Sequence, residues 1–137
     1  TNEAALEAVR IALAEASKRD LRISVAVVDS SMNLVAFARG DGATPHSIQT
    51  SRRKANTAAS TGRSTGWMSP ELAVALPLGT DNLLTNIPGG VPLRFEGVLA
   101  GGIGIAGGTV QEDATIATVV LKSLRTFHFV VFHKKLK

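Results

Sequence analysis

The fold of this chain is decided by one glycine-rich stretch, Ile87-Pro-Gly-Gly-Val-Pro-Leu-Arg-Phe-Glu-Gly-Val-Leu-Ala-Gly-Gly-Ile-Gly-Ile-Ala-Gly-Gly-Thr109, which holds eight of the thirteen glycines. The stretch predicts a strand over 91–95, a turn at Glu96-Gly97 and a second strand over 98–106, and therefore a β-hairpin. Glycine weakens a strand and usually marks a position where another backbone or a ligand approaches closely. We expect this hairpin to form either the floor of a binding site or a tightly packed structural seam.

The residues before this hairpin predict a helix, a second hairpin and another helix. Apolar residues recur at three- and four-residue steps near the N-terminus, which is typical of one face of a helix. A run rich in β-branched residues then predicts a buried strand, and turn residues connect it to a further strand. Thr44 is suited to cap a second helix with Pro45 as its first residue, because proline needs no N–H at that position. The predicted elements are a helix over 2–19, strands over 23–29 and 34–39, and a helix over 45–60.

The remaining helices are predicted from their capping residues. Ser69 and Pro70 are suited to begin a short helix, and Pro77 is expected to end it. After the glycine-rich hairpin, Thr109-Val-Gln-Glu112 is a capping box that predicts the start of a last helix. The predicted elements are a helix over 70–75, one helical turn over 81–86 and a last helix over 110–124.

Two hairpins separated by helices predict an α+β fold, with helices packed against an antiparallel sheet. We expect a single domain over 1–124. Residues 125–137 differ from it in composition, because they hold three of the five phenylalanines and no acidic residue. We expect this tail to be foreign to the domain or a frayed extension. The alternative is an added edge strand used for contact between subunits.

The composition excludes several classes of protein. The chain has no cysteine, which excludes a disulfide framework, a cysteine metal cluster and a thiol nucleophile. No apolar run reaches the roughly 18 residues that span a bilayer, and no signal peptide is evident. The net charge is +4, but residues 122–137 carry five of the basic side chains, which leaves ten basic against eleven acidic side chains elsewhere. A basic face that follows a phosphate backbone is therefore not predicted, and we expect no nucleic-acid binding.

The segment Gly102-Ile-Gly-Ile-Ala-Gly107 matches the dinucleotide pattern G-x-G-x-x-G in letters only. Two of its glycines lie inside the predicted strand, and no acidic residue follows Asp113, so the nucleotide-binding motif is not predicted. The exit of the hairpin, Gly107-Gly-Thr109, remains open to two interpretations. It is an ordinary helix start, or its free N–H groups hold a carboxylate or phosphate.

The candidate polar residues for a site are His46, Arg53, Lys54 and Asp113. His46 is either a solvated surface residue or an axial ligand or general base, since neutral imidazole coordinates iron. Glu112 is expected to cap the last helix, whereas Asp113 is free to bond elsewhere, including to a glycine-rich backbone. Arg53 and Lys54 are expected on the polar side of their helix, as a solvated face or as partners for ligand carboxylates. The sequence has no H-x-x-x-H metal spacing.

Five segments together resemble a known family. In chain order they are Ser24-Val-Ala-Val-Val-Asp29, Arg39-Gly-Asp-Gly-Ala43, the helical residues 47–58, Pro88-Gly-Gly-Val-Pro92, and Gly101-Gly-Ile-Gly-Ile-Ala-Gly-Gly-Thr109 followed by Asp113. This order resembles the GlcG/HbpS-like family, which includes secreted haem-binding proteins and the C-terminal domain of PduO-type proteins. The resemblance covers about residues 2–122, and the last fifteen or so residues depart from it.

The resemblance implies a profilin-like antiparallel β-sheet flanked by α-helices, and assembly into symmetric homo-oligomers. Some members of the family bind haem through a histidine, in pockets at subunit interfaces, and some degrade haem. His46 is the residue that the resemblance suggests for haem iron, although it falls on a variable position of the signature. The candidate cofactor-binding residues are His46, Arg53, Lys54, Gly89, Gly90 and Asp113.

Three functions remain open from the sequence. The first is an oligomeric protein that binds a small molecule, with haem or a related tetrapyrrole as its ligand and without a strong catalytic signature. The second is an enzyme acting on a small carboxylic acid or cofactor, with His46 or Asp113 as acid/base. The third is an assembly scaffold. A cytoplasmic location is favoured, although some haem-binding relatives are exported.

Overall fold

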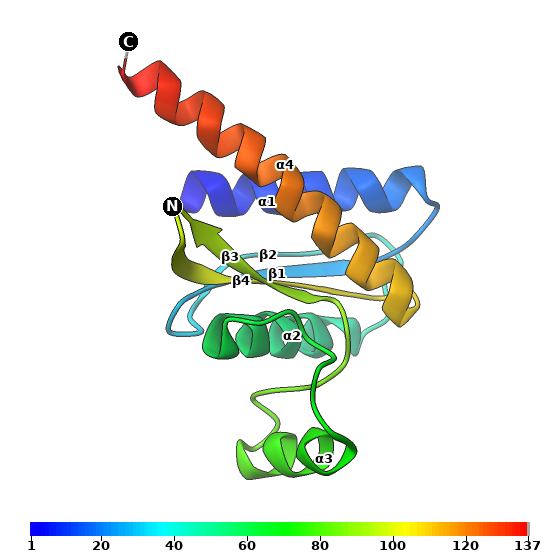
Figure 1. Cartoon of the computed structure of the whole chain (residues 1–137). Coiled ribbons are helices and arrows are strands. Elements are labelled where there is room, and N and C mark those ends of the chain that lie inside the picture. Colours follow the sequence, from blue (N-terminus) through cyan, green and yellow to red (C-terminus); the bar gives the residue numbers. More distant parts are fainter. Residues whose placement is uncertain (137) are drawn as a thin grey trace.

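The computed structural model describes the backbone of residues 1–136 and the side chains of residues 1–126. A four-stranded antiparallel sheet of order β2-β1-β4-β3 forms the centre of the molecule. Helix α2 covers one face of the sheet, and α1 and α4 cover the other, as Figure 1 shows. The α+β fold is therefore confirmed. The elements are α1 (Asn2–Lys18), β1 (Ser24–Asp29), β2 (Leu34–Arg39), α2 (Ser47–Thr61), α3 (Pro70–Gly79), β3 (Gly90–Phe95), β4 (Val98–Ala106) and α4 (Val110–Leu136).

Both hairpins form where the sequence predicts them. Glu96 and Gly97 have φ angles of 54° and 80°, the left-handed pair that a tight two-residue hairpin turn needs. In the other hairpin, the Asp29 carboxylate accepts hydrogen bonds from the N–H groups of Ser31 and Asn33, at 2.9 Å and 3.0 Å. The two hairpins meet along β1 and β4, where Val27 pairs with Ile103.

The glycines of β4 make a structural seam with α2. A Cβ atom at Gly104 would collide with the carbonyl oxygen of Ser51 and would lie 2.6 Å from the nitrogen of Ala55. A Cβ atom at Gly102 would collide with the carbonyl oxygen of Ala55. The missing side chains therefore let the backbone of α2 lie directly on the backbone of β4. The glycine-rich hairpin is therefore a tightly packed structural seam, which is one of the two interpretations of its sequence.

The main hydrophobic core lies on the opposite face, between the sheet and helices α1 and α4. Ile103 and Ile105 alternate with the glycines along β4, so their side chains point to this face. They pack with buried residues of both helices and of β1 and β3. The buried helix residues of this core are Ala5, Ala8, Val9, Ala12, Ala16, Ile116, Ala117, Val120 and Leu124.

The start of α2 and the course of α3 differ from the prediction. Helix α2 begins at Ser47, with His46 rather than Thr44 in the cap position, because Pro45 lies in the preceding turn. Helix α3 continues through Pro77 to Gly79, since a proline near its end removes only one backbone hydrogen bond.

Two further segments correct the prediction. Residues 81–86 form no helical turn, because Asp81 and Asn82 have positive φ angles of 54° and 60°. Helix α4 continues to Leu136 instead of ending near Leu124, so the added edge strand predicted as an alternative for the tail is wrong. Among the residues that the structure describes, no helix is long and apolar enough to cross a membrane.

Candidate ligand-binding site

A buried ion pair joins α2 to the first turn of α4. The ammonium nitrogen of Lys54 lies 2.9 Å from Oδ2 of Asp113, and the two side chains are 2% and 3% exposed. Lys54 also donates a hydrogen bond to the carbonyl oxygen of Ile105, at 2.7 Å. The second carboxylate oxygen of Asp113 accepts from the N–H of Gly108, at 2.9 Å. The prediction that Lys54 lies on the polar side of its helix is therefore wrong, because its charge has a buried partner.

The glycines before β3 make room for this pair. Gly89 has a φ of +126°, and a Cβ atom there would lie 2.6 Å from the carbonyl oxygen of Ile105 and 2.8 Å from the Lys54 ammonium. A Cβ atom at Gly90 would lie 2.9 Å from the carbonyl carbon of Lys54. Only glycine fits at these two positions without moving the lysine, which explains the Pro88-Gly-Gly turn in this place.

Burial lowers the pKa of the Lys54 ammonium below its ordinary value, because desolvation penalises the charged form. The attraction of Asp113 and its hydrogen bond oppose this effect without cancelling it. Two of the three N–H donors of Lys54 have partners among the described residues, the carbonyl of Ile105 and the carboxylate of Asp113.

A depression of about 390 Å³ lies over this ion pair, between the N-terminus of α2 and the start of α4, and we call it the α2–α4 pocket. Lys54 and Asp113 form its polar floor. Ile87 and Val110 bring exposed apolar side chains to it. A pocket of this size falls within the range of about 300–1,000 Å³ that small-molecule sites occupy. The other lining residues are Thr44, His46, Ser47, Thr50, Ala106, Gly107 and Gly108.

His46 stands at the N-terminal end of α2, exposed to solvent and in contact with the α2–α4 pocket. Its side chain makes no capping hydrogen bond to the helix. Thr50 and Lys54 follow at four-residue steps, which place all three residues on one face of α2. Thr50 is a pocket residue that was not among the predicted ones, although this helical spacing is a signal in the sequence that identifies it.

The structure brings together most of the predicted site residues. His46, Lys54 and Asp113 line the α2–α4 pocket, and Gly89 and Gly90 pack against Lys54. Arg53 is half-buried on α2 and does not line the pocket. Its role as a carboxylate partner stays a prediction. Ile87 and Val110 were missed because single apolar residues next to glycine turns carry no distinctive pattern.

One interpretation of the hairpin exit offers the N–H groups of residues 107–109 to an anion, and two of these groups, those of Gly108 and Thr109, already have partners within the chain. The N–H of Gly108 donates to Asp113, and the N–H of Thr109 donates to Oε1 of Glu112 at 2.8 Å. The hydroxyl of Thr109 in turn accepts from the N–H of Glu112, which completes the predicted capping box. The carboxylates of Asp113 and Glu112 therefore occupy the positions that a bound anion would take at Gly108 and Thr109.

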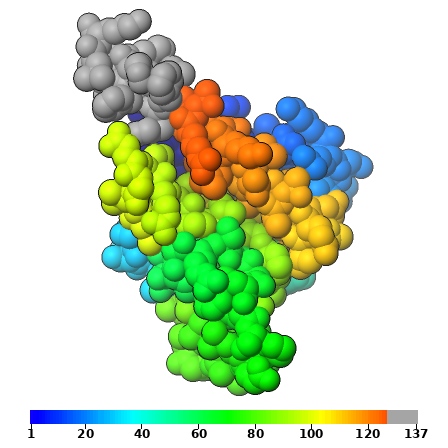
Figure 2. Space-filling model, in the orientation of Figure 1, coloured from blue at the N-terminus to red at the C-terminus, as the bar shows by residue number. Residues whose placement is uncertain are grey.

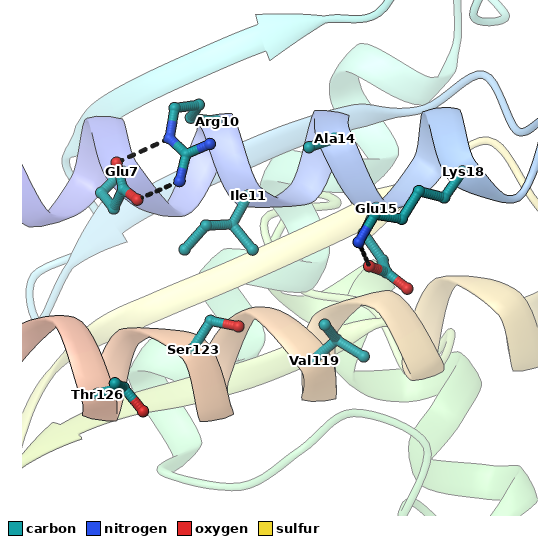
Figure 3. A pocket seen from close by; sticks show the side chains of 9 residues that line it. All are labelled: Glu7, Arg10, Ile11, Ala14, Glu15, Lys18, Val119, Ser123 and Thr126. Carbon is teal, nitrogen blue, oxygen red and sulfur yellow. Dashed lines mark hydrogen bonds and ion pairs between the residues drawn. The ribbon is translucent and has the colours of Figure 1, made fainter.

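A second hollow lies between α1 and α4, and the four charged residues that line it are paired with one another along α1 (Figure 3). Its volume is about 520 Å³. Figure 3 shows Glu7 paired with Arg10 and Glu15 paired with Lys18 along α1. Because the charges within each pair neutralise one another, these four residues leave no net charge in the hollow to attract a charged ligand. Among the described residues, no group of three His, Cys, Asp or Glu side chains is placed to hold a metal ion.

Comparison with known proteins identifies the family. Residues 1–122 match the family model described as "Haem degrading protein HbpS-like". Protein GlcG of Escherichia coli strain K12 is 36% identical over 93 residues, which cover 67% of this chain and 69% of GlcG.

Solved structures agree with this assignment. A double mutant of Streptomyces reticuli HbpS is 37% identical and superimposes with a TM-score of 0.81, over 90% of this chain and 86% of that one. The crystal structure of a PduOC:Heme complex has a TM-score of 0.83 over 89% of this chain and 92% of that one, and at 24% identity it supports the fold alone. The chain therefore belongs to the HbpS-like family, as its motif order suggests.

Proposed function

We propose that this protein is an oligomeric small-molecule-binding protein whose ligand is haem or a related tetrapyrrole. The observation that carries the proposal is the position of His46 at the α2–α4 pocket, near the exposed apolar side chains of Ile87 and Val110. Membership of the HbpS-like family, whose model is described as haem degrading, supports it. Haem iron is often held by a histidine, and apolar side chains suit the faces of the macrocycle.

The residues of the pocket fit such a ligand. The neutral imidazole of His46 would coordinate the iron, and Ile87 and Val110 would contact the ring. Lys54 in the pocket lining, and Arg53 elsewhere on α2, would be the partners for propionate carboxylates. Bound haem supplies a redox-active iron and strong visible absorption.

The catalytic alternative has weaker support. Both carboxylate oxygens of Asp113 are used inside the fold, one by Lys54 and one by Gly108. A general base needs a lone pair within reach of the substrate proton. Asp113 is therefore a structural residue in our proposal, and His46 is the only one of the two candidates that is exposed at the pocket.

Haemin titration tests the proposal. We expect the wild-type protein to shift and sharpen the Soret band with saturable binding, and His46→Ala to weaken haemin binding and change the band position. The matched control is a variant with His128→Ala and His133→Ala, which removes the two tail histidines and is expected to titrate like the wild type. Absence of a wild-type shift overturns the haem proposal. Loss of the shift in the control, but not in His46→Ala, moves the ligand to the tail.

A further inference from the structure

Two buried polar atoms have no hydrogen-bond partner among the residues that the structure describes. They are the amide oxygen Oδ1 of Asn56, in α2, and the indole nitrogen Nε1 of Trp67, in the segment before α3. Asn56 as a whole is only 7% exposed. Nearly all buried polar groups in folded proteins are hydrogen-bonded, because an unpaired one loses its contacts with water without replacement. Each of the two atoms therefore needs a partner that is not one of these residues.

The amide of Asn56 has a fixed orientation. Its nitrogen Nδ2 donates a hydrogen bond to the carbonyl oxygen of Leu83, at 3.3 Å. A carbonyl oxygen only accepts hydrogen bonds, so exchanging the two ends of the amide would bring two acceptors together. The end of the amide without a partner among the described residues is therefore the oxygen, and it needs a donor.

The indole of Trp67 is held in place by its neighbours. The Arg63 guanidinium lies 4.0 Å from the centre of the indole ring. The N–H of Met68, the next residue along the chain, donates to the side-chain oxygen of Asn86 at 3.0 Å. These contacts fix both the ring and the backbone that carries it. An indole N–H can only donate, so Nε1 needs an acceptor.

Residues 83–87 connect the surroundings of the two atoms. On one side α2 holds this stretch, where the Thr57 hydroxyl accepts a hydrogen bond from the N–H of Thr85 at 2.8 Å. On the other side the segment before α3 holds it, where the Thr65 hydroxyl donates to the carbonyl oxygen of Ile87 at 2.8 Å. Figure 2 shows the green residues of this side of the molecule as one continuous surface. The acceptor on α2 and the donor before α3 therefore border the same short stretch of chain.

We propose that a water molecule binds between Asn56 and Trp67, where it accepts a hydrogen bond from Nε1 and donates one to Oδ1. Both atoms are buried, so the molecule that pairs with them is small. Water is the smallest molecule that both accepts and donates, and buried waters commonly join polar groups that lack other partners. This water fastens the entry of α3 to α2. Neither residue lines the α2–α4 pocket, so the site is separate from that of the proposed haem.

Nuclear magnetic resonance tests the site in the wild-type protein, because Trp67 is the only tryptophan of the chain and gives a single indole N–H signal. We expect a nuclear Overhauser cross-peak between this hydrogen and water, with the sign of a water that tumbles with the protein. In a crystal structure we expect a water oxygen within about 3.2 Å of both Nε1 and Oδ1. An indole signal without the cross-peak, or a direct hydrogen bond between the two atoms, overturns the proposal. Neither measurement depends on a variant that folds.

Two variants test whether Asn56 holds this water. Asn56→Leu replaces the acceptor by an apolar side chain of similar shape, and we expect the cross-peak to disappear and the indole signal to shift. Gln49→Leu is the matched control, because it removes an exposed amide from the same helix, and it is expected to keep both as in the wild type. A cross-peak that persists in Asn56→Leu contradicts the bridge. An indole signal that moves when the wild-type protein is diluted shows that a second copy, rather than water, meets the indole, and it also overturns the proposal.

Discussion

Lys54 and Asp113 are 59 residues apart in the chain, yet the ammonium nitrogen of one lies 2.9 Å from the carboxylate of the other. Their contact ties the middle of α2 to the first turn of α4 beneath the α2–α4 pocket. Removing either partner leaves a buried charge without its counterion, which is costly in a medium of low polarity.

The ion pair leads to a prediction for stability. Lys54→Met is expected to lower the free energy of unfolding by about 3–5 kcal/mol, because the Asp113 carboxylate loses its buried counterion. Urea denaturation measures this change. In the double variant Lys54→Met with Asp113→Leu no charge is left buried, so we expect a loss smaller than the sum of the two single losses. Additive losses would mean that the two side chains do not interact.

The seam between β4 and α2 leads to a second prediction. Gly104→Ala places a methyl group against the Ser51 carbonyl and is expected to destabilise the fold by about 3 kcal/mol or more. Gly79→Ala is the matched control, because a Cβ atom there meets nothing within 4 Å. It is expected to stabilise by about 0.5–1 kcal/mol, the usual gain of alanine over glycine in a helix. Thermal unfolding followed by circular dichroism distinguishes the two.

The turn between β1 and β2 predicts a sensitivity to acid. The backbone N–H of Asn33 is the main cause that lowers the pKa of Asp29 below its ordinary value of 3.8, and the Asn33 side chain and the Ser31 N–H add to it. A carboxyl whose pKa is lower in the folded state stabilises the fold above its ordinary pKa, and this stabilisation is lost as the pH falls through the folded value. Unfolding at pH 7 and pH 2.5 should show wild type more stable than Asp29→Asn only at the higher pH. An equal difference at both pH values would contradict this assignment.

The division of the chain into a domain and a tail predicts the effect of truncation. Leu124 is the last residue of α4 that belongs to the described core, and the family model ends at residue 122. A chain ending at 124 is expected to keep its free energy of unfolding within about 0.5 kcal/mol of the full chain. A chain ending at 119 loses the buried Val120 as well as Leu124, and we expect it not to fold cooperatively. Unfolding of the 124-residue chain at a much lower urea concentration would make the tail part of the domain.

Local patterns are sufficient to predict most of the sheet. Both hairpins are specified by residues that adjoin each other, such as Glu96-Gly97 with its left-handed turn. The capping box at Thr109 and Glu112 is likewise contained in four consecutive residues. Such features follow from backbone preferences, which do not depend on the rest of the chain.

Some errors arise where a distant residue decides the outcome, and others have a local cause. Lys54 reads as a surface residue because its partner, Asp113, is far away in the sequence and becomes a neighbour only through the tertiary fold. Helix α3 continues past Pro77 because one missing N–H near a helix end costs little. The candidate site residues follow from their local sequence and from the family motifs, whereas the apolar contacts at Ile87 and Val110 required the structure.

The glycines of β4 also determine how the molecule can deform. Where α2 rests on β4 at Gly102 and Gly104, backbone meets backbone, and there are no side-chain rotamers at these two positions to absorb a tilt of the helix. Helix α2 and strand β4 are therefore expected to move together as one rigid unit. A ligand that enters the α2–α4 pocket cannot widen it by sliding α2 along the sheet. The α2 wall of the pocket is therefore positioned by main-chain contact with the sheet rather than by side-chain packing.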